Sequence, residues 1–352
     1  MQSSTLNDLI ELLSENEELS PDQIANSIDA LIDPEVRESE KIEFLSSMAK
    51  KGETESEFSH YVREFRTRAI NPELEEFSSN AIDLCGTGGD KAGSFNISTF
   101  VAFLLASAGV TVIKHGNRSI SSKCGSADLI EAVGISLHPE RQKLQECLKS
   151  LNFGFLFAPH YHPAFKHIAP IRKILADQGI LTFFNVMGPM INPARPAHQL
   201  VGTYDPNYLK PMATALESNQ LKSGLIAHCK VNSEGISSVD ELTTCGENLV
   251  LGFGRAKTSG IEKWNPSKWN QSSHSIQDLK GGNLSENINI MKKILCGDAK
   301  TGLVSSILVN AATAFLICGK VDQLGEGIEL SESLIQDNKV RNWLERAEAF
   351  FK

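Results

Sequence analysis

The feature that most constrains the fold is a glycine cluster between a short apolar run and a helix-like segment. Residues 81–85 are mostly apolar, Gly86, Gly88 and Gly89 follow, and residues 96–108 start with polar caps and become strongly apolar. A β-branched run over residues 110–113 comes next. This order predicts strand, loop, helix and strand, a βαβ unit with parallel strands and a right-handed crossover.

The larger part of the chain is therefore expected to be an α/β domain with a central, largely parallel sheet, over residues 76–352. Further apolar runs predict strands at residues 153–157, 199–204 and 224–229. Residues 1–75 differ, because their apolar side chains recur at helical spacing and Ser20-Pro21 is a typical helix start. They predict a small all-α domain, joined by helices from about residues 163–195.

Composition excludes several classes of protein. The formal net charge of −9 argues against a nucleic-acid-binding surface. The longest apolar run, Phe100 to Val110, is too short to span a membrane, and the polar, acidic start predicts no signal peptide. The seven cysteines are scattered without a C-x-x-C pair, so we expect no disulfide framework and a cytoplasmic location. Residues 264–275 are expected to form an exposed loop.

The glycine cluster is the first candidate site. Glycines allow a tight turn that exposes backbone amides to an anion, and the N-terminus of the following helix favours phosphate at the same place. Hydroxyl and amide groups at Asn96, Ser98 and Thr99 add donors. The alternative is an ordinary strand-to-helix turn. The glycine spacing matches neither the P-loop nor the dinucleotide fingerprint, which disfavours a nicotinamide dehydrogenase.

A second candidate site follows the second strand of the βαβ unit. Lys114, Arg118 and Lys123 stand there with several hydroxyl side chains. Ligands bind at the carboxyl ends of strands in open α/β sheets, so this basic loop and the glycine loop should face one pocket. The alternative is a solvated basic loop.

These motifs resemble those of anthranilate phosphoribosyltransferases. The similarity covers residues 86–90 and 94–99, then 114–118 and 121–128, and continues nearly end to end. It includes Lys51-Gly52-Glu53-Thr54, Phe157-Ala158-Pro159, His162-Pro163-Ala164, Phe184-Asn185, Gly188-Pro189, Asn192-Pro193, Asp240-Glu241, Leu279-Lys280-Gly281-Gly282 and Asn310-Ala311-Ala312. The resemblance implies transfer of a 5-phosphoribosyl group from phosphoribosyl pyrophosphate to the amine of anthranilate, in tryptophan biosynthesis, by a nucleoside phosphorylase-like fold. It also implies a homodimer that pairs through the helical domain.

The resemblance assigns roles by position. Phosphoribosyl pyrophosphate would be held by Gly86, Thr87, Gly88, Gly89, Asp90, Ser94, Asn96, Ile97, Ser98, Thr99, Lys114, His115, Gly116, Asn117, Arg118, Ser119, Ser121, Ser122 and Ser126. Anthranilate would be held by Gly86, His115, Asn117, His162 and Arg172. Ser98, Asp240 and Glu241 would bind Mg²⁺. No residue is expected to act as acid, base or nucleophile.

The implied roles suit the chemistry of the side chains. Carboxylates such as Asp240 and Glu241 suit Mg²⁺, although a lone Asp-Glu pair is more often solvated. Arg172 stands in a segment that looks helical with a kink at Pro170, and guanidinium matches a carboxylate in bidentate geometry. A surface arginine is the alternative. His115 and His162 could be bases, but packing beside the substrate is the simpler interpretation.

Some features depart from the family pattern or leave alternatives open. Ala176-Asp177-Gln178 looks like an insertion, Leu181 stands where a basic residue is common, and residues 227–239 look like a lengthened loop before the acidic pair. The nearest rival function is a pyrimidine nucleoside phosphorylase, and a relative with another aromatic acceptor is the second. A degenerate relative that binds nucleic acid is disfavoured, since both motifs are intact and the chain is acidic.

Overall fold

Four helices open the chain in the computed structural model, which describes residues 5–118, 123–233 and 235–352. They are α1 (Leu6–Ser14), α2 (Pro21–Ile32), α3 (Glu38–Lys51) and α4 (Glu55–Arg68). Ser20 accepts a hydrogen bond from the Gln23 amide at the start of α2, and Thr54 caps α4 in the same way. These side chains satisfy amides that have no partner inside the helix, which fixes where each helix begins.

In the described part of the chain, eight strands form one sheet in the order β3-β2-β1-β4-β5-β7-β8, with β6 paired to β5. The strands are β1 (Ile82–Gly86), β2 (Val112–Gly116), β3 (Phe153–Phe157), β4 (His198–Gly202), β5 (Ser223–Ser233), β6 (Ile236–Val239), β7 (Glu247–Phe253) and β8 (Glu262–Trp264). The first five are parallel, and β6, β7 and β8 pair antiparallel. The predicted fold class, a largely parallel sheet with helices plus a helical region, is confirmed.

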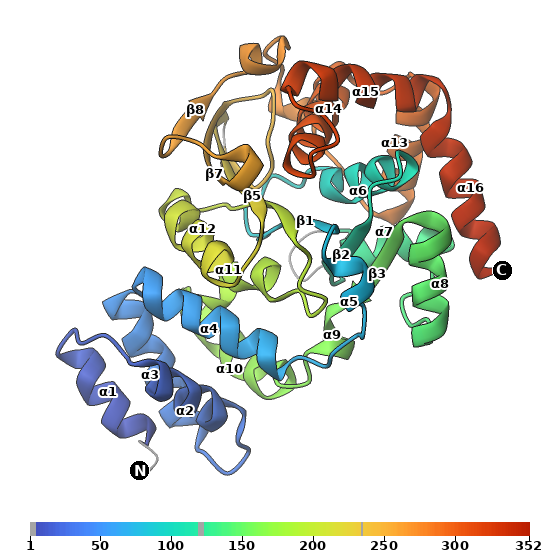
Figure 1. Ribbon diagram of the computed structural model, residues 1–352. Coiled ribbons are helices and arrows are strands. Elements are labelled where there is room, and N and C mark those ends of the chain that lie inside the picture. Colours follow the sequence, from blue (N-terminus) through green and yellow to red (C-terminus); the bar gives the residue numbers. More distant parts are fainter. Residues whose placement is uncertain (1–4, 119–122, 234) are drawn as a thin grey trace.

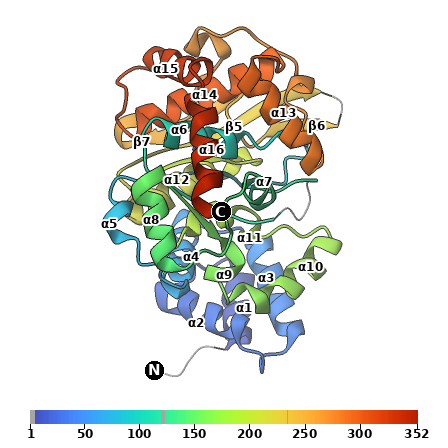
Figure 2. The ribbon, with the colours of Figure 1, turned by 90° about the vertical axis from the view of Figure 1, so that its right-hand side faces the viewer.

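The remaining elements pack on the sheet or on the helices that cover it. They are α5 (Glu75–Ser78), α6 (Ile97–Ser107), α7 (Ser126–Ala132), α8 (Arg141–Leu151), α9 (Ala158–Tyr161), α10 (Phe165–Asp177), α11 (Phe184–Met187), α12 (Leu209–Ser218), α13 (Leu284–Cys296), α14 (Thr301–Ile317), α15 (Leu324–Gln336) and α16 (Lys339–Phe351). Short 3₁₀ turns are η1 (Gly188–Ile191), η2 (Pro206–Tyr208), η3 (Gly254–Ala256), η4 (Pro266–Trp269) and η5 (Ile276–Asp278). Helices α1–α3 and α14–α15 lie at opposite ends of the molecule (Figures 1 and 2).

Two apolar cores lie on opposite faces of the sheet. Leu200 belongs to the core with α6, α14 and α16, whereas the next residue, Val201, belongs to the core with α2, α4 and α10–α12. This follows from the alternation of side chains along a strand. The N-terminal helices are thus packed continuously onto the sheet through α10–α12. No single helix in the described ranges is long and apolar enough to cross a membrane. Within these ranges, only α13 and α14 taken together reach the required length and apolar composition, and this pair is bent by 80°.

Two expectations about the second half of the chain need correction. Residues 264–275 form an exposed loop only in part: most of residues 270–275 are exposed, but Trp264 and Trp269 are 5% and 1% exposed and pack edge to face. Burial of two large aromatic surfaces outweighs the polar residues around them. Residues 227–239 form most of the β5–β6 hairpin rather than a lengthened loop, so the acidic pair follows a strand.

Candidate active site

The two predicted loops meet at one edge of the sheet. β1 lies between β2 and β4 and is parallel to both, so the loop after Gly86 and the loop after Gly116 leave neighbouring strand ends. Gly88 and Gly89 have φ angles of 72° and 83°, a left-handed conformation that glycine adopts without strain. The two loops therefore start side by side, and the expectation that they face one pocket stays a prediction.

Asp240 and Glu241 are folded against the glycine loop instead of being solvated. The Asp240 Oδ2 atom accepts a hydrogen bond from the Gly88 amide at 2.7 Å, and Glu241 Oε1 accepts one from the Ser98 amide at 3.1 Å. A Cβ atom on Gly86 would lie 2.1 Å from Asp240 Oδ2, so only glycine permits this approach. The structure therefore brings together the acidic pair, the glycine loop and the start of α6.

The acidic pair faces a third carboxylate, Asp90, and the charge of one lysine, Lys114. Burial raises the pKa of Asp240 well above its ordinary value, and the charges of Asp90 and Glu241 raise it further. Burial raises the pKa of Glu241 to about 7, against the opposing effect of Lys114. Buried carboxylates without matching cations are unstable, so the site favours a bound cation.

The donor set fits Mg²⁺. Carboxylate and hydroxyl oxygens are the ligands that Mg²⁺ prefers, and Asp240, Glu241 and Ser98 offer them. Within the described ranges no three Asp, Glu, His or Cys side chains form a complete metal site. Magnesium commonly completes its shell with water and substrate phosphate, so a partial protein site is what this ion needs.

Lys114 lies beneath the loops and is only 1% exposed. Its Nζ atom donates to the Leu84 carbonyl and, at 3.4 Å, to Ser98 Oγ. Asp83 lies in the same buried region, where its carboxylate accepts hydrogen bonds from Asn192 Nδ2 at 2.9 Å and from the His115 amide at 3.3 Å. The solvated-loop alternative is therefore wrong for Lys114.

The outer part of the basic loop is arranged differently. Arg118 donates to Asp128 Oδ1 at 2.6 Å and to Glu131 Oε2 at 2.8 Å, so its guanidinium is paired with α7. Ser126 Oγ donates to the Asn117 carbonyl at 3.3 Å. Ser119, Ser121 and Ser122 lie outside the described residues. The roles assigned to this loop stay predictions.

Residues at the start of α6 differ in what they offer a ligand. Ile97 and Thr99 are buried, and Thr99 Oγ1 has no partner within the described residues, so their side chains face the core. Asn96 is held by Asn287 of α13, whose Nδ2 atom donates to Asn96 Oδ1 at 2.9 Å. Sequence reasoning missed Asn287. The only signal was its position five residues after the Gly281-Gly282 motif, whose Gly282 amide donates to Asn287 Oδ1 at 2.8 Å.

A second group of side chains forms a continuous row from the basic loop to α10. The rings of His115 and His162 have centroids 5.0 Å apart, and His162 packs edge-on against Phe165 at 5.7 Å. Phe165 packs on Phe184 at 5.8 Å, and the Arg172 guanidinium lies 5.7 Å from the Phe184 ring. The structure thus links three of the predicted anthranilate-binding residues, His115, His162 and Arg172, through aromatic contacts.

One nitrogen of each histidine in this row is unsatisfied. The Nε2 atoms of His115 and His162 are buried and have no hydrogen-bond partner in the described part of the chain. Burial lowers the pKa of His162 to about 4 and that of His115 well below its ordinary value, so both rings are neutral. Burial also lowers the pKa of Arg172, which forms no ion pair with any described carboxylate. Such atoms are suited to a small polar aromatic ligand with an acidic group.

The departures from the family pattern lie beside this row. Ala176 and Asp177 form the end of α10, and Gln178 is its C-terminal cap, so the inserted residues lie one turn beyond Arg172. Leu181 is 58% exposed in the turn that leads to α11. Cys85, beneath the glycine loop, has a thiol whose pKa is raised well above its ordinary value by burial, which fits a small packing residue.

Comparisons with known proteins agree with the geometry. Residues 78–340 match the family described as "Glycosyl transferase family, a/b domain". The chain is 38% identical to the anthranilate phosphoribosyltransferase of Petrotoga mobilis, over 95% of this chain and 93% of the relative. It is 33% identical to that of Persephonella marina, over 99% of both. The solved enzyme from Thermus thermophilus is 34% identical, covers 98% of this chain and 99% of its own, and superposes with a TM-score of 0.86. The chain belongs to the anthranilate phosphoribosyltransferase family.

Proposed function

We propose that this chain transfers the 5-phosphoribosyl group of phosphoribosyl pyrophosphate to the amine of anthranilate and releases pyrophosphate. The observation that carries the proposal is the pair of under-neutralised carboxylates, the buried Asp240 and the half-buried Glu241, held against a glycine loop and a helix N-terminus. A substrate with a pyrophosphate and a divalent cation supplies the charges that this arrangement lacks. A yeast relative was solved in complex with this substrate and Mg, at 22% identity.

The phosphate-bearing substrate would lie over the glycine loop. Its oxygens would accept hydrogen bonds from loop amides and from the N-terminal amides of α6, where the helix dipole favours anions. Asp240, Glu241 and Ser98 would hold Mg²⁺, which stabilises charge that develops on the departing pyrophosphate. Lys114 contributes a fixed positive charge below the site, since its Nζ atom already contacts Ser98 Oγ at 3.4 Å.

Anthranilate would lie along the row of aromatic side chains. Arg172 would bind its carboxylate in bidentate geometry, and the unsatisfied Nε2 atoms of His115 and His162 would orient its polar edge. The amine of anthranilate is neutral at pH 7 and attacks ribose C1 directly. Neutral histidines fit this role, because the reaction requires no proton to be removed before attack.

Closure of the helical region would align amine and ribose. We propose that residues 1–75, with helices from about 163–195, move relative to the rest of residues 76–352 and exclude water that would compete with anthranilate. We also propose a homodimer through the helical domain, which sedimentation at micromolar concentration would test, and a cytoplasmic location, which fits the scattered cysteines.

Loss of anthranilate fluorescence, as the acceptor is consumed, gives the decisive test. Purified protein is mixed with anthranilate, phosphoribosyl pyrophosphate and Mg²⁺, and each component is omitted in turn. Turnover that requires all three supports the proposal. Phosphorolysis of thymidine or uridine with no turnover of anthranilate would instead support the pyrimidine nucleoside phosphorylase alternative. Transfer to another aromatic amine alone would identify a different acceptor.

A further inference from the structure

A cavity of about 440 Å³ lies at the opposite edge of the sheet from the active site. Ser79 precedes β1, Ala197 precedes β4 and Lys222 precedes β5, and all three residues line the cavity. The carboxyl ends of β1 and β4 lead to the glycine loop and the acidic pair. The cavity is therefore separate from the proposed catalytic site by the length of a strand, about 16 Å for five residues.

Three cationic side chains surround this cavity. Arg66 comes from the last turn of α4, Arg195 from the turn before β4, and Lys222 from the turn before β5. Glu75 is the one carboxylate in the lining, and its side chain accepts a hydrogen bond from Asn71 Nδ2 at 2.8 Å. The lining thus carries three positive charges and one negative charge, in a chain whose formal net charge is −9.

Arg66 is the unusual member of this group. Arg66 is only 7% exposed, yet its guanidinium forms no ion pair with any carboxylate in the described ranges. Its one recorded hydrogen bond runs from Nη1 to the Asn219 carbonyl at 3.4 Å. Burial, and then the nearby charge of Arg195, lower the pKa of Arg66 to about 10. A buried guanidinium beside a second one costs free energy unless an anion joins them.

Arg195 supports the same interpretation. It has a φ angle of 53°, a left-handed conformation that is uncommon for a residue with a side chain. It is exposed and forms no ion pair within the described residues. The pKa of Glu75 is lowered by the Asn71 hydrogen bond and, to a smaller extent, by the charge of Arg195, so this carboxylate attracts the guanidinium without occupying its hydrogen-bond donors. Lys222 Nζ donates to the Ser79 carbonyl at 2.7 Å, which holds its charge at the rim.

We propose that this cavity binds a small phosphate-bearing anion between Arg66, Arg195 and Lys222. Guanidinium groups match phosphate oxygens in bidentate geometry, and a dianion balances the net charge of the lining. The volume lies within the range of small-molecule sites and exceeds what a phosphate ion needs, so a phosphate monoester of a small polar molecule fits better than the free ion.

Binding there has a structural consequence. The ligand connects α4 of the helical region to the segments that start β1, β4 and β5, so it stabilises the junction between the helices and the sheet. Phosphate at ten times its dissociation constant should raise the unfolding midpoint by about 2 °C in a chain of this size. This effect is independent of the proposed catalytic reaction.

The test uses the full chain with labelled inorganic phosphate in equilibrium dialysis, and with thermal unfolding at constant ionic strength. Wild type is compared with Arg66→Met, Arg195→Ala and Lys222→Ala. Arg63→Ala is the matched control, because Arg63 is exposed on the same helix but does not line the cavity. Phosphate bound in the active site is common to all variants, so only the difference between them reports on this cavity.

We expect wild type and Arg63→Ala to bind one more equivalent of phosphate than the three cavity variants. We also expect Arg66→Met to unfold at the same or a higher temperature without anion, since it removes an unpaired buried charge; a purely structural arginine would lower the midpoint. If Arg66→Met fails to fold, the phosphate stoichiometry and the midpoint shifts of Arg195→Ala and Lys222→Ala test the proposal. Equal stoichiometry and equal midpoint shifts in wild type and those two variants would overturn the proposal.

A competition experiment distinguishes a phosphate monoester from the free phosphate ion as the ligand. Glycerol 3-phosphate that displaces the extra equivalent at lower concentration than phosphate itself supports a monoester as ligand. If glycerol 3-phosphate displaces the bound phosphate only at a much higher concentration, the ligand is the free phosphate ion. The cavity would then still be a phosphate site, but the monoester would be ruled out as its ligand.

Discussion

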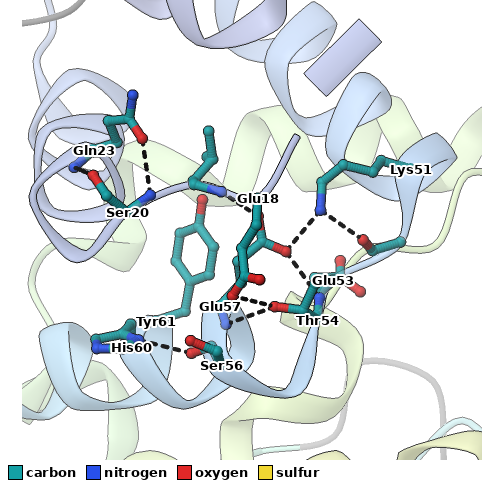
Figure 3. Close-up of polar contacts among 12 residues, drawn as sticks. Glu18, Ser20, Gln23, Lys51, Glu53, Thr54, Ser56, Glu57, His60 and Tyr61 are labelled. Carbon is teal, nitrogen blue, oxygen red and sulfur yellow. Dashed lines mark hydrogen bonds and ion pairs between the residues drawn. The ribbon is translucent and has the colours of Figure 1, made fainter. Parts of the chain in front are cut away.

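Two buried carboxylate sites in this molecule have opposite surroundings. Glu57, at the start of α4, accepts hydrogen bonds from Lys51 Nζ at 2.7 Å, the Thr54 amide at 2.8 Å and the Leu19 amide at 2.9 Å (Figure 3). Asp240 and Glu241 each accept one recorded backbone hydrogen bond and face a further carboxylate, Asp90. Glu57 and Asp240 are both buried, so burial does not distinguish the two sites.

The difference lies in charge balance. Glu57 has an ammonium group and two amides, which join α3, α4 and the segment before α2, and the site is complete without a ligand. At the sheet edge the protein leaves negative charge unbalanced, which costs stability and is retained where a ligand supplies the missing cation. A buried acid with all partners present therefore indicates architecture, and one without them indicates binding.

The largest expected effect follows from removing the unbalanced site. Replacing Asp240 and Glu241 together by alanine should lower kcat/KM at least a thousandfold, which corresponds to about 4 kcal/mol of transition-state stabilisation. Steady-state rates at several Mg²⁺ concentrations measure this, with circular dichroism as a check of folding. A loss below tenfold with unchanged metal dependence would mean that the pair does not hold the cation.

The balanced site should show the reverse behaviour. Glu57→Ala leaves a buried Lys51 unpaired and two amides without acceptors, so unfolding free energy should fall by about 3–5 kcal/mol. Urea denaturation measures this, and the folded fraction should retain its turnover number. Glu55→Ala is the control, since its surface pair with Lys210 should contribute about 1 kcal/mol or less. Similar losses for both variants would contradict the assignment.

Arg172 extends the comparison to an unbalanced positive charge. Arg172→Ala should raise KM for anthranilate about 30-fold, with KM for phosphoribosyl pyrophosphate little changed, because it removes a charged hydrogen-bonded pair worth about 2 kcal/mol. Arg172→Lys should recover part of the loss, as it keeps charge without the bidentate geometry. The exposed neighbour Lys173→Ala serves as control. An equal rise in both KM values would argue against a carboxylate contact.

The smallest expected effect concerns pH. Burial lowers the pKa of His162 from 6.5 to about 4, so the folded protein holds this ring neutral while the unfolded chain binds a proton. The stability that depends on the neutral ring is present above pH 6.5 and is lost as pH falls toward 4, by about 1–3 kcal/mol. His162→Phe should reduce the change of the unfolding free energy with pH, as measured by denaturation between pH 7 and 4. An unchanged slope would show that the ring is not buried as described.

Much of this site was predictable from sequence because its residues follow strand ends. The glycine loop after β1 and the basic loop after β2 meet for reasons of βαβ topology alone. Asn287 was not predictable, since it lies 191 positions from its partner Asn96 and carries no local pattern. Nor was the burial of Trp269 or Lys114, because local composition does not reveal which tertiary surface covers a residue.

The charge-balance account is tested most directly by the unfolding midpoint of Asp240→Asn/Glu241→Gln with and without Mg²⁺ and phosphoribosyl pyrophosphate. This isosteric variant keeps the shape of both side chains and removes their charge. We predict that it unfolds at or above the wild-type temperature without ligand and gains nothing from the metal and substrate, which stabilise wild type. A variant that is less stable without ligand, yet stabilised by metal and substrate as strongly as wild type, would contradict the account.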